Sequence, residues 1–294
     1  MTQYYSSTPA ATMVLMSYNQ ADVISESIKS LLDQECEPIE IMISDDFSTD
    51  KTWDRIVEVV SKYDGPHIIR MNQNRKNLGL IKHYNKCFSM ASADIVIVCG
   101  GDDISLPTRA KKIVDKFNET NALLIFSDVD KYALNDRSLA DQILRNPPQF
   151  YTTISSYAGA KSLGLYVGAS AAYHKDLFVK YGYIEDDNVY EDLILGFRAS
   201  LENRVEMINE KLVQYRIGGI TTNHLFGLDK EAEIAHAIAE AKRHISVYRL
   251  RLTDIIMLRR KYLYLIPSIL FYILKKSKRL LKLKLLRLIS TPSV

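Results

Sequence analysis

The sequence predicts an α/β fold in which a mostly parallel central sheet is flanked by helices. Short charge-free runs such as IVIVC at residues 95–99 have the length and apolarity of strands that are buried on both faces. Stretches of about a dozen residues with apolar side chains at helical spacing separate these runs, an alternation typical of βαβ units. The chain has 294 residues, 47% of them hydrophobic, which is enough for a sizeable core.

The order of the elements follows from the local sequence pattern. Strands are expected at residues 12–17, 39–44, 67–71, 94–99, 122–127, 204–209 and 211–217. Helices are expected at residues 24–32, 49–60, 80–90, 108–119 and 190–201. Asp22 and Ser48 are the expected N-caps of the first two helices, because short polar side chains accept hydrogen bonds from free backbone N–H groups there. Residues 128–162 have a weaker pattern and are expected to form long connections that cover a site.

Two aspartate pairs directly follow buried strands, Asp45-Asp46 and Asp102-Asp103. Ligands bind beyond the carboxyl ends of parallel strands, where like charges repel unless a cation or water separates them. Carboxylate oxygens suit Mg²⁺ or Mn²⁺, and phosphate oxygens often complete the shell of these ions. For any single pair, spacing alone favours turn residues and helix caps over a metal site, since the chain has a third pair, Asp186-Asp187.

Several short motifs occur in a specific order. They are SYN at residues 17–19, SDDFSTDKT at 44–52, NLG at 77–79, GGDD at 100–103 and ED at 191–192. Over roughly residues 11–220 this order resembles the motif set of family 2 glycosyltransferases with the GT-A fold. The resemblance implies an inverting, metal-dependent enzyme that moves a sugar from a nucleotide-sugar donor to a hydroxyl of a glycan acceptor. At family level it points to bacterial surface polysaccharide synthesis, such as O-antigen, capsule or lipooligosaccharide.

The resemblance also implies a domain division and a role for each motif. A GT-A catalytic domain would cover residues 1–225, with a nucleotide-binding half at about 11–103, an acceptor-binding half at 104–225, and a C-terminal helical region at 226–294. The implied nucleotide-sugar-binding residues are Ser17, Tyr18, Asn19, Asp45, Asp46, Asn77, Gly79, Asp102 and Arg216. Asp102 and Asp103 would ligate a divalent metal, Mn²⁺ or Mg²⁺. Asp192 would be the general base, and Glu191 would share the catalytic site and orient the acceptor.

Some of these roles have simpler alternatives. The usual DXD-type signature has an acid where this chain has Gly100, so a ribose or metal contact made there in some relatives is missing or supplied by the backbone. Glu191 and Asp192 are also favourable as plain acids in the first turn of a helix. Arg216, in QYRIGG, suits a diphosphate but equally suits the surface of an edge strand.

Two other functions use the same residues differently. A nucleotidyl or phosphoryl transferase would employ the paired aspartates, but it would need a phosphate loop, and neither G-x-x-x-x-G-K-[ST] nor G-x-G-x-x-G occurs. A non-catalytic glycan-binding protein on the same fold would bind without turnover, which the intact acids disfavour.

Cysteine usage and the N-terminus indicate a cytoplasmic setting. Cys36, Cys87 and Cys99 are far apart and form no C-x-x-C pair, so neither a zinc site nor a disulfide framework is expected. The first residues, MTQYYSSTPAATM, lack the basic start and apolar run of a signal peptide.

Charge is distributed unevenly along the chain. From Arg251 onward there are eleven Lys and Arg and a single acid, Asp254, whereas the preceding residues carry 27 bases and 34 acids. The charge-free run at residues 262–274 is too short to span a bilayer and precedes a stretch of bases mixed with leucines. We expect this tail to bind an anionic membrane surface, near a lipid-linked acceptor, on the inner face of the cytoplasmic membrane. The alternative is a helix packed on the catalytic domain or in an oligomer interface; no nucleic-acid-binding module accompanies the charge.

Overall fold

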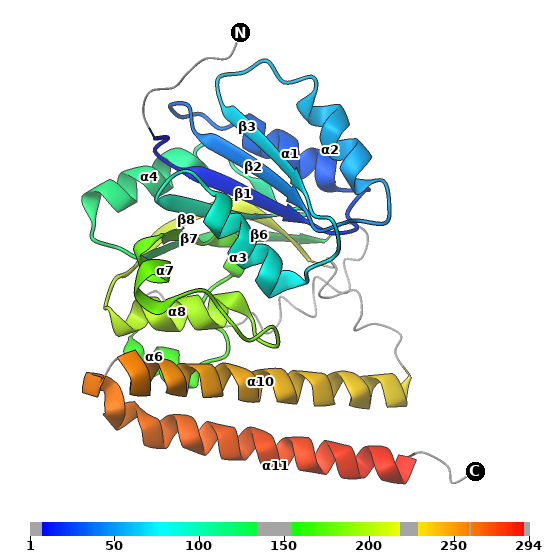
Figure 1. Ribbon diagram of the computed structural model, residues 1–294, viewed down its shortest axis with the longest axis vertical. Helices are drawn as coiled ribbons and strands as arrows, with labels where there is room; N and C mark the ends of the chain where they lie inside the picture. The colour runs from blue at the N-terminus through cyan, green and yellow to red at the C-terminus, as the bar shows by residue number, and fades with distance from the viewer. Residues whose placement is uncertain (1–7, 134–154, 218–228, 259, 291–294) are drawn as a thin grey trace.

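A computed structural model describes residues 8–133, 155–217, 229–258 and 260–290. One eight-stranded sheet lies at the centre of these residues, with helices on both of its faces (Figure 1). The strands are β1 (Thr12–Ser17), β2 (Glu40–Asp45), β3 (Ile68–Gln73), β4 (Ile95–Gly100), β5 (Ile104–Ser105), β6 (Leu124–Ala133), β7 (Ala172–His174) and β8 (Val205–Ile217). The helices are α1 (Ile24–Leu32), α2 (Thr52–Val60), α3 (Leu80–Met90), α4 (Arg109–Glu119), α6 (Ser156–Lys161), α7 (Asp176–Tyr181), α8 (Glu191–Leu201), α10 (Lys230–Leu258) and α11 (Ile266–Ser290), with short 3₁₀ turns η1 (Gly168–Ser170) and η2 (Arg260–Leu265).

The strand order is β3-β2-β1-β4-β7-β6-β8-β5. The first four strands are parallel, and helices α1, α2 and α3 connect them in sequence. The short strand β7 runs antiparallel to both β4 and β6, and β8 runs parallel to β6 but antiparallel to β5. The predicted α/β fold is therefore confirmed, with a parallel first half and a mixed second half. The two strands expected at residues 204–209 and 211–217 form one strand, β8.

Side chains that alternate along β1 face two different cores. Met13 and Leu15 pack with α1, α2 and α4, whereas Val14 packs with α3 and α8 on the opposite face. Strand β4 is buried from Ile95 to Cys99, as expected for a strand covered on both sides. Both layers of helices therefore depend on one sheet, and the carboxyl ends of β1, β2 and β4 meet at one edge.

Two expected helix caps are wrong. Helix α1 begins after Val23 and α2 after Lys51, and neither cap position makes a side-chain hydrogen bond to the helix. At α2, Asp50 accepts from the backbone N–H of Thr52 instead, at 2.9 Å. Ser48 has a tertiary role, described below. Of the connections expected at residues 128–162, residues 134–154 lie outside the described residues.

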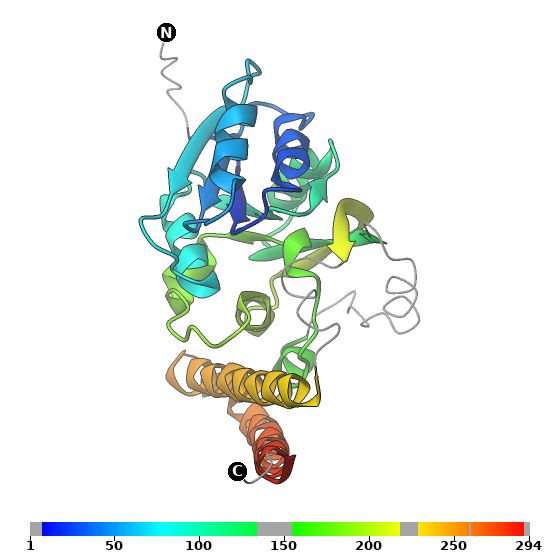
Figure 2. The same cartoon turned by 90° about the vertical axis from the view of Figure 1, so that its right-hand side faces the viewer.

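The C-terminal region forms a pair of long helices beneath the sheet. Helices α10 and α11 lie side by side, and α10 is the one that contacts α8 (Figures 1 and 2). Among the described residues, no helix combines the length and the apolarity needed to cross a bilayer.

Candidate functional site

A cleft of about 350 Å³ opens at the carboxyl ends of β1, β2 and β4. It is lined by Met16, Ser17, Tyr18, Gln20, Asp46, Asn77, Gly79, Leu80, His83, Val98, Cys99, Gly100, Gly101, Asp102, Gly168, Ala169 and Glu191. The lining includes seven residues that the sequence predicts for the site, namely Ser17, Tyr18, Asp46, Asn77, Gly79, Asp102 and Glu191. Acids that are about 150 positions apart in sequence thus face one cavity.

Asp46 holds the wall of the cleft that the NLG motif forms. Its Oδ1 accepts hydrogen bonds from the backbone N–H of Leu78 at 2.9 Å and from Asn74 Nδ2 at 2.7 Å. Its Oδ2 accepts from the backbone N–H of Gly79 at 3.0 Å. Gly79 has φ 77°, a left-handed conformation that glycine adopts without steric cost, and this turn starts α3. The carboxylate therefore ties the end of β2 to the start of α3.

Asp45 lies behind the cleft rather than in its lining. Its carboxylate accepts from the Ser48 backbone N–H at 3.0 Å, from Ser48 Oγ at 2.5 Å and from Ser17 Oγ at 3.3 Å. Ser48 Oγ in turn accepts from the backbone N–H of Asn19 at 2.9 Å, and Asn19 Oδ1 accepts from the Thr49 N–H at 2.8 Å. Asp45 and Asn19 thus join the loops after β1 and β2, and Ser48 is used in this network instead of capping a helix.

The first residue of the GGDD motif, Gly100, has no room for a side chain. A Cβ at Gly100 would lie 2.7 Å from Asp103 Oδ2 and 3.0 Å from Asp102 Oδ1, so both carboxylates fold back over this position. Asp102 lines the cleft, whereas Asp103 is buried and its Oδ1 accepts from the Arg216 backbone N–H at 3.0 Å. The departure from the DXD signature at Gly100 therefore matches the space that the two aspartates occupy.

Arg216 braces the GGDD loop from behind. Its Nε donates to the Asp102 carbonyl at 2.9 Å, and its Nη2 forms an ion pair with Glu26 Oε2 at 3.0 Å. The side chain is buried on β8 and is not part of the cleft lining. The structure thus places Arg216 against the backbone that presents Asp102, and not on the cavity itself.

The site suits a divalent cation that shares its shell with a substrate. Burial raises the pKa of Asp102, and burial together with the Asp102 charge raises the pKa of Asp103 to about 7, so extra negative charge is costly here unless a cation offsets it. Within the described residues no group of three metal-ligating side chains occurs. One or two carboxylates fit Mg²⁺ or Mn²⁺, since these ions commonly take their remaining ligands from phosphates and water.

The acid pair stands at the first turn of α8, across from η1. A Cβ at Gly168 would lie 3.4 Å from Asp192 Cβ and 3.5 Å from Glu191 Oε1, so the glycine keeps this side of the cleft open. Burial and the neighbouring Asp192 charge raise the pKa of Glu191 to about 8, while burial raises that of Asp192 to about 6. At neutral pH the pair therefore carries its negative charge on Asp192, the protonation state that a general base needs.

Several cleft residues have no motif that would reveal them in the sequence. His83, on α3, shares a hydrogen bond of 2.7 Å between its Nε2 and Ser44 Oγ, and burial lowers its pKa. Gln20 and Ala169 line the wall beside the GGDD loop and η1. These positions come together only through the fold, because His83 lies on α3, Ala169 in η1 and Gln20 in the loop after β1.

Comparison with known proteins identifies the family. Residues 12–182 match the family model for glycosyl transferase family 2, which is more than half of the chain. The chain belongs to glycosyl transferase family 2. The matched segment includes the SYN, SDDFSTDKT, NLG and GGDD motifs, and it ends before the acid pair of α8.

Similar proteins support the assignment of this chain as a glycosyltransferase. An uncharacterized glycosyltransferase of Nostoc sp. is 22% identical over 250 residues, which cover 82% of this chain and 76% of that protein. The succinoglycan biosynthesis protein ExoO of Rhizobium meliloti is 29% identical over 133 residues, 45% of this chain and 36% of that protein. This protein is thus a glycosyltransferase with relatives in polysaccharide biosynthesis.

Two solved structures share the fold. Residues 1–349 of TarS from S. aureus, in complex with UDP-GlcNAc, superpose with a TM-score of 0.57 at 16% identity, covering 85% of this chain and 74% of that one. The mannosyltransferase PcManGT from Pyrobaculum calidifontis, in complex with GDP-Man and Mn²⁺, gives a TM-score of 0.60 at 13% identity, covering 98% and 77%. The glycosyltransferase has the GT-A fold.

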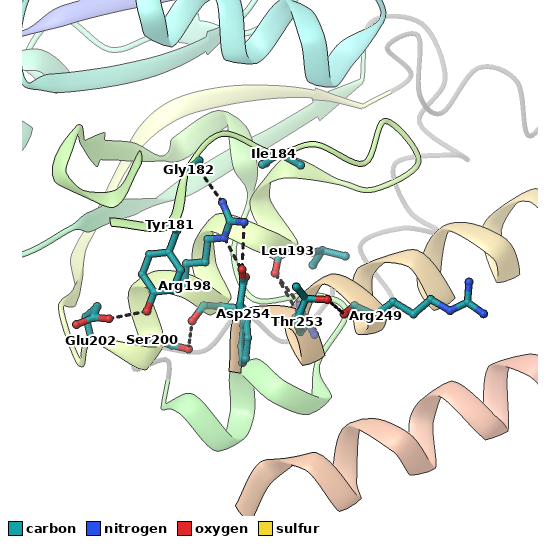
Figure 3. A network of polar contacts seen from close by, with 12 residues as sticks. Tyr181, Gly182, Ile184, Leu193, Arg198, Ser200, Glu202, Arg249, Thr253 and Asp254 are labelled. Carbon is teal, nitrogen blue, oxygen red and sulfur yellow. Dashed lines mark hydrogen bonds and ion pairs between the residues drawn. The ribbon is translucent and has the colours of Figure 1, made fainter. Parts of the chain in front are cut away.

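Helix α10, the first long helix of the C-terminal region of this glycosyltransferase, is bonded to the helix that carries the acid pair. Arg198 of α8 forms a buried ion pair with Asp254 of α10, with Nε to Oδ2 at 2.9 Å and Nη2 to Oδ1 at 3.2 Å, and its Nη1 donates to the Gly182 carbonyl (Figure 3). Next to the acid pair, the guanidinium of Arg243 lies 4.6 Å from the ring centre of Tyr190. Helix α10 therefore helps to fix the position of α8.

Proposed function

We propose that this glycosyltransferase is inverting and metal-dependent, and that it transfers a sugar from a nucleotide-sugar donor to a hydroxyl of a glycan acceptor. The observation that carries the proposal is the single cleft faced by Asp46, Asp102 and Glu191. We assign its two sides to the two substrates, with the donor on residues of about 11–103 and the acceptor on residues of 104–225. We assign residues 226–294 to a C-terminal helical region, in which α10 packs on α8.

On the donor side, backbone and carboxylate groups offer hydrogen bonds to a nucleotide. Ser17, Tyr18 and Asp46 line the part of the cleft next to the NLG loop, where a base and ribose would lie. Carboxylates are good acceptors for imide and hydroxyl hydrogens. Asp45, Asn19 and Arg216 support these groups through the loop contacts described above.

Asp102, with Asp103 beside it, would hold Mn²⁺ or Mg²⁺ together with the donor diphosphate. A bound divalent cation would stabilise the negative charge of the departing nucleoside diphosphate, an effect worth several kcal/mol. The chain's own contribution is to hold the Asp102 carboxylate in the cleft, through the bond from Arg216 Nε to its carbonyl.

On the acceptor side, Asp192 would take the proton of the attacking hydroxyl. The attack would occur on the face of the anomeric carbon opposite the diphosphate, which inverts the configuration in one displacement. Glu191, which is protonated at neutral pH because its pKa is raised, can donate a hydrogen bond that orients the acceptor. A positioned base contributes about 10² to 10⁴ in rate.

The experiment that tests this function compares two aspartate variants. Purified protein with Mn²⁺ is first screened by thermal shift against a panel of nucleotide sugars, because a ligand of the folded state raises the melting temperature. With the donor found, Asp192→Asn should lose turnover and keep donor binding by calorimetry. The matched control is Asp187→Asn, an exposed acid near the same helix. Normal turnover of Asp192→Asn would exclude Asp192 as the base.

The C-terminal helix supports the further proposal that the enzyme binds the cytoplasmic face of an anionic membrane as a peripheral protein. Helix α11 carries seven Lys and Arg and no acid. Five leucines on its outer side lie within about 60° of one another on a helical projection, at 3.6 residues per turn. They are Leu270 (43% exposed), Leu274 (62%), Leu281 (61%), Leu285 (51%) and Leu288 (73%). Apolar bulk beside cations suits a headgroup region, and would bring the cleft near a lipid-linked acceptor.

A second copy of the chain fits the leucine face of α11 less well than a membrane does. In such a dimer two α11 helices would meet, and the seven positive charges of each would repel those of the other. Cosedimentation with vesicles that contain anionic lipid tests whether α11 binds a membrane or a second copy of the chain. Leu274→Glu combined with Leu281→Glu should abolish binding, whereas Val179→Glu, on the 85% exposed Val179 of α7, should not. Equal binding of both variants would refute docking through α11, and dimers in sedimentation velocity without vesicle binding would favour the second copy.

The relative ExoO supports a role in bacterial polysaccharide synthesis, which we propose for this enzyme. Surface polysaccharides such as O-antigen, capsule or lipooligosaccharide provide the hydroxyl acceptors that the cleft requires. Fractionation of the saccharides that accept label from the donor found above would test this, and transfer only to a non-glycan acceptor would contradict it.

A further inference from the structure

Arg251 of α10 is a fully buried cation next to the acid pair. Its exposed fraction is 0%. All its hydrogen bonds go to backbone carbonyls: Nε and Nη2 to Leu193 O, at 3.3 and 2.8 Å, and Nη1 to Ser162 O, at 2.8 Å. Among the described residues, no carboxylate forms an ion pair with Arg251. The guanidinium also lies 5.4 Å from the ring centre of Phe197 and 5.6 Å from that of Tyr248, and the nearby carboxylates of Asp192 and Asp254 favour its charged form without a direct ion pair.

Leu193, whose carbonyl accepts from Arg251, directly follows Asp192 in the first turn of α8. Figure 3 shows how α10 passes along α8 at this level. Arg243, elsewhere on α10, donates to Glu240 and to Tyr190 instead. The guanidinium of Arg251 thus lies under the first turn of α8, where Asp192 is adjacent to Glu191, the acid that lines the cleft.

The other groups around Asp192 are all acids or phenols. They are Glu191 on α8, Tyr84 on α3, Tyr166 before η1, Tyr173 on β7 and Tyr215 on β8. Tyr166 donates to the Asp192 carbonyl at 2.9 Å and shares a 2.6 Å hydrogen bond with Tyr173. None of these groups supplies a positive charge. Against the effect of burial, the pKa of Asp192 is lowered first by the Leu193 N–H, which donates to Asp192 Oδ1 at 2.7 Å, then by the charge of Arg251, and last by its own backbone N–H. Arg251 is not among the causes of the shift at Glu191.

We propose that Arg251 is a positioning residue that keeps the single negative charge of the acid pair on Asp192, and so selects Asp192 rather than Glu191 as the base. This inference rests on the proposed transferase function only for its catalytic consequence. The placement of the charge is a property of the protein itself.

A purely mechanical role for Arg251, as a tie between α10 and α8, makes a different prediction. Arg198 joins the same two helices and is equally buried, but Asp254 neutralises its charge. Replacing Arg198 removes the direct partner of Asp254, whereas replacing Arg251 removes a cation that forms no direct ion pair with a carboxylate among the described residues. The two arginines therefore form a matched pair for experiment.

The test measures the pKa of Asp192 directly and through turnover. In protein labelled with ¹³C at aspartate carboxyls, the Asp192 signal is assigned with Asp192→Asn and titrated in wild type, Arg251→Gln and Arg198→Lys. Arg251→Gln should raise the pKa of Asp192 by about one unit or more, because an opposite charge at close range shifts a carboxyl by roughly 1–3 units. The acidic limb of kcat should move up in pH by the same amount, with lost activity recovered at higher pH.

Arg251→Lys keeps the charge and should restore the wild-type profile, while Arg198→Lys should leave its shape unchanged. If Arg251→Gln does not fold, Arg251→Met, which preserves the apolar stem, takes its place with the same expected shift. An Asp192 pKa that is unchanged in the uncharged variant overturns the inference. A shifted pKa in a protein whose Asp192→Asn variant still turns over would uphold the inference and refute the proposed base instead.

Discussion

The carboxylate of Asp46 accepts a hydrogen bond from the backbone N–H of Gly79, with 3.0 Å between Oδ2 and N. This contact joins residues 33 positions apart, in the SDDFSTDKT and NLG motifs, and shapes the wall of the cleft that we assign to the donor. In Asp46→Asn an amide NH₂ replaces one acceptor oxygen, so the loop loses at least one of its hydrogen bonds to the side chain at position 46, although the Gly79 N–H also donates to Asn77 Oδ1 at 2.8 Å. Donor affinity should fall about 10- to 100-fold, since a hydrogen bond to a charged group is worth roughly 1.5–3 kcal/mol.

Calorimetry with the donor measures this loss. Asp54→Asn, on the exposed side of α2, is the control and should bind normally. Unchanged donor affinity in Asp46→Asn would contradict the assigned role of the loop contact.

The stability of the protein should depend on pH through Glu191. The pKa of Glu191 is raised from its ordinary value of 4.5 to about 8, chiefly by burial, so the folded state holds a proton that the unfolded state has lost in this range. Its contribution to stability is therefore fully present below about pH 4.5 and is lost as the pH rises through 8. Glu191→Gln removes this loss and should be more stable than wild type at pH 8, by more than about 1 kcal/mol.

Urea unfolding of both proteins at pH 6 and pH 9 checks this expectation. The difference in free energy of unfolding should grow with pH in favour of Glu191→Gln. A difference that is constant across this range would show that Glu191 is not held protonated by the fold.

Gly100 should resist substitution even by alanine. The added Cβ would meet the carboxylates of Asp102 and Asp103 at 3.0 and 2.7 Å, and Asp103 could move only by giving up its bond to the Arg216 N–H. We expect Gly100→Ala to lower kcat/KM at least about tenfold, because a misplacement of 1 Å can cost 10²-fold.

Gly164→Ala provides the control, because nothing lies within 4 Å of a Cβ there. Gly100→Asp, which restores the more usual signature, should be worse than Gly100→Ala. Full activity of Gly100→Asp in the donor assay would mean that the two aspartates do not occupy the positions described.

Breaking the buried ion pair between Arg198 and Asp254 should cost about 3–5 kcal/mol, since a buried charge is left without its partner. The double variant Arg198→Met with Asp254→Leu removes both charges and should recover much of that loss. A double-mutant cycle by urea unfolding measures the coupling. Simple additivity of the two single losses would show that the pair does not act as one unit.

The sheet and half of the site could be predicted from the sequence because they depend on local patterns. Asp46 and Asp102 follow apolar strand runs, and the carboxyl ends of parallel strands share one edge, so their meeting follows from the strand order. Asp45 and Asp103 are adjacent to them in sequence, yet both turn into the protein toward partners on other elements. Which member of each pair faces the cleft depends on the backbone of the turns, and the sequence pattern does not contain that information.

Long-range partners account for the remaining differences. Ser48 looks like a helix cap, but Asp45 and Asn19 engage its hydroxyl from outside the local segment. Arg251 has no motif around it and reaches Leu193 across 58 residues of sequence. Its contact exists only because α10 packs on α8, and that packing arises from burial of side chains and not from any short pattern.

The clamp between α8 and α10 limits how this enzyme can be recombined with its relatives. Arg198 bonds to Gly182 on one side and to Asp254 on the other, so α8 is held between an upstream loop and a downstream helix. A chimaera that receives α8 alone, to exchange acceptor specificity, would bury Arg198 in a relative that lacks its partner Asp254. A segment that is exchanged between relatives should therefore extend from the loop before α8 through the end of α10. This is the shortest graft that includes both Arg198 and Asp254.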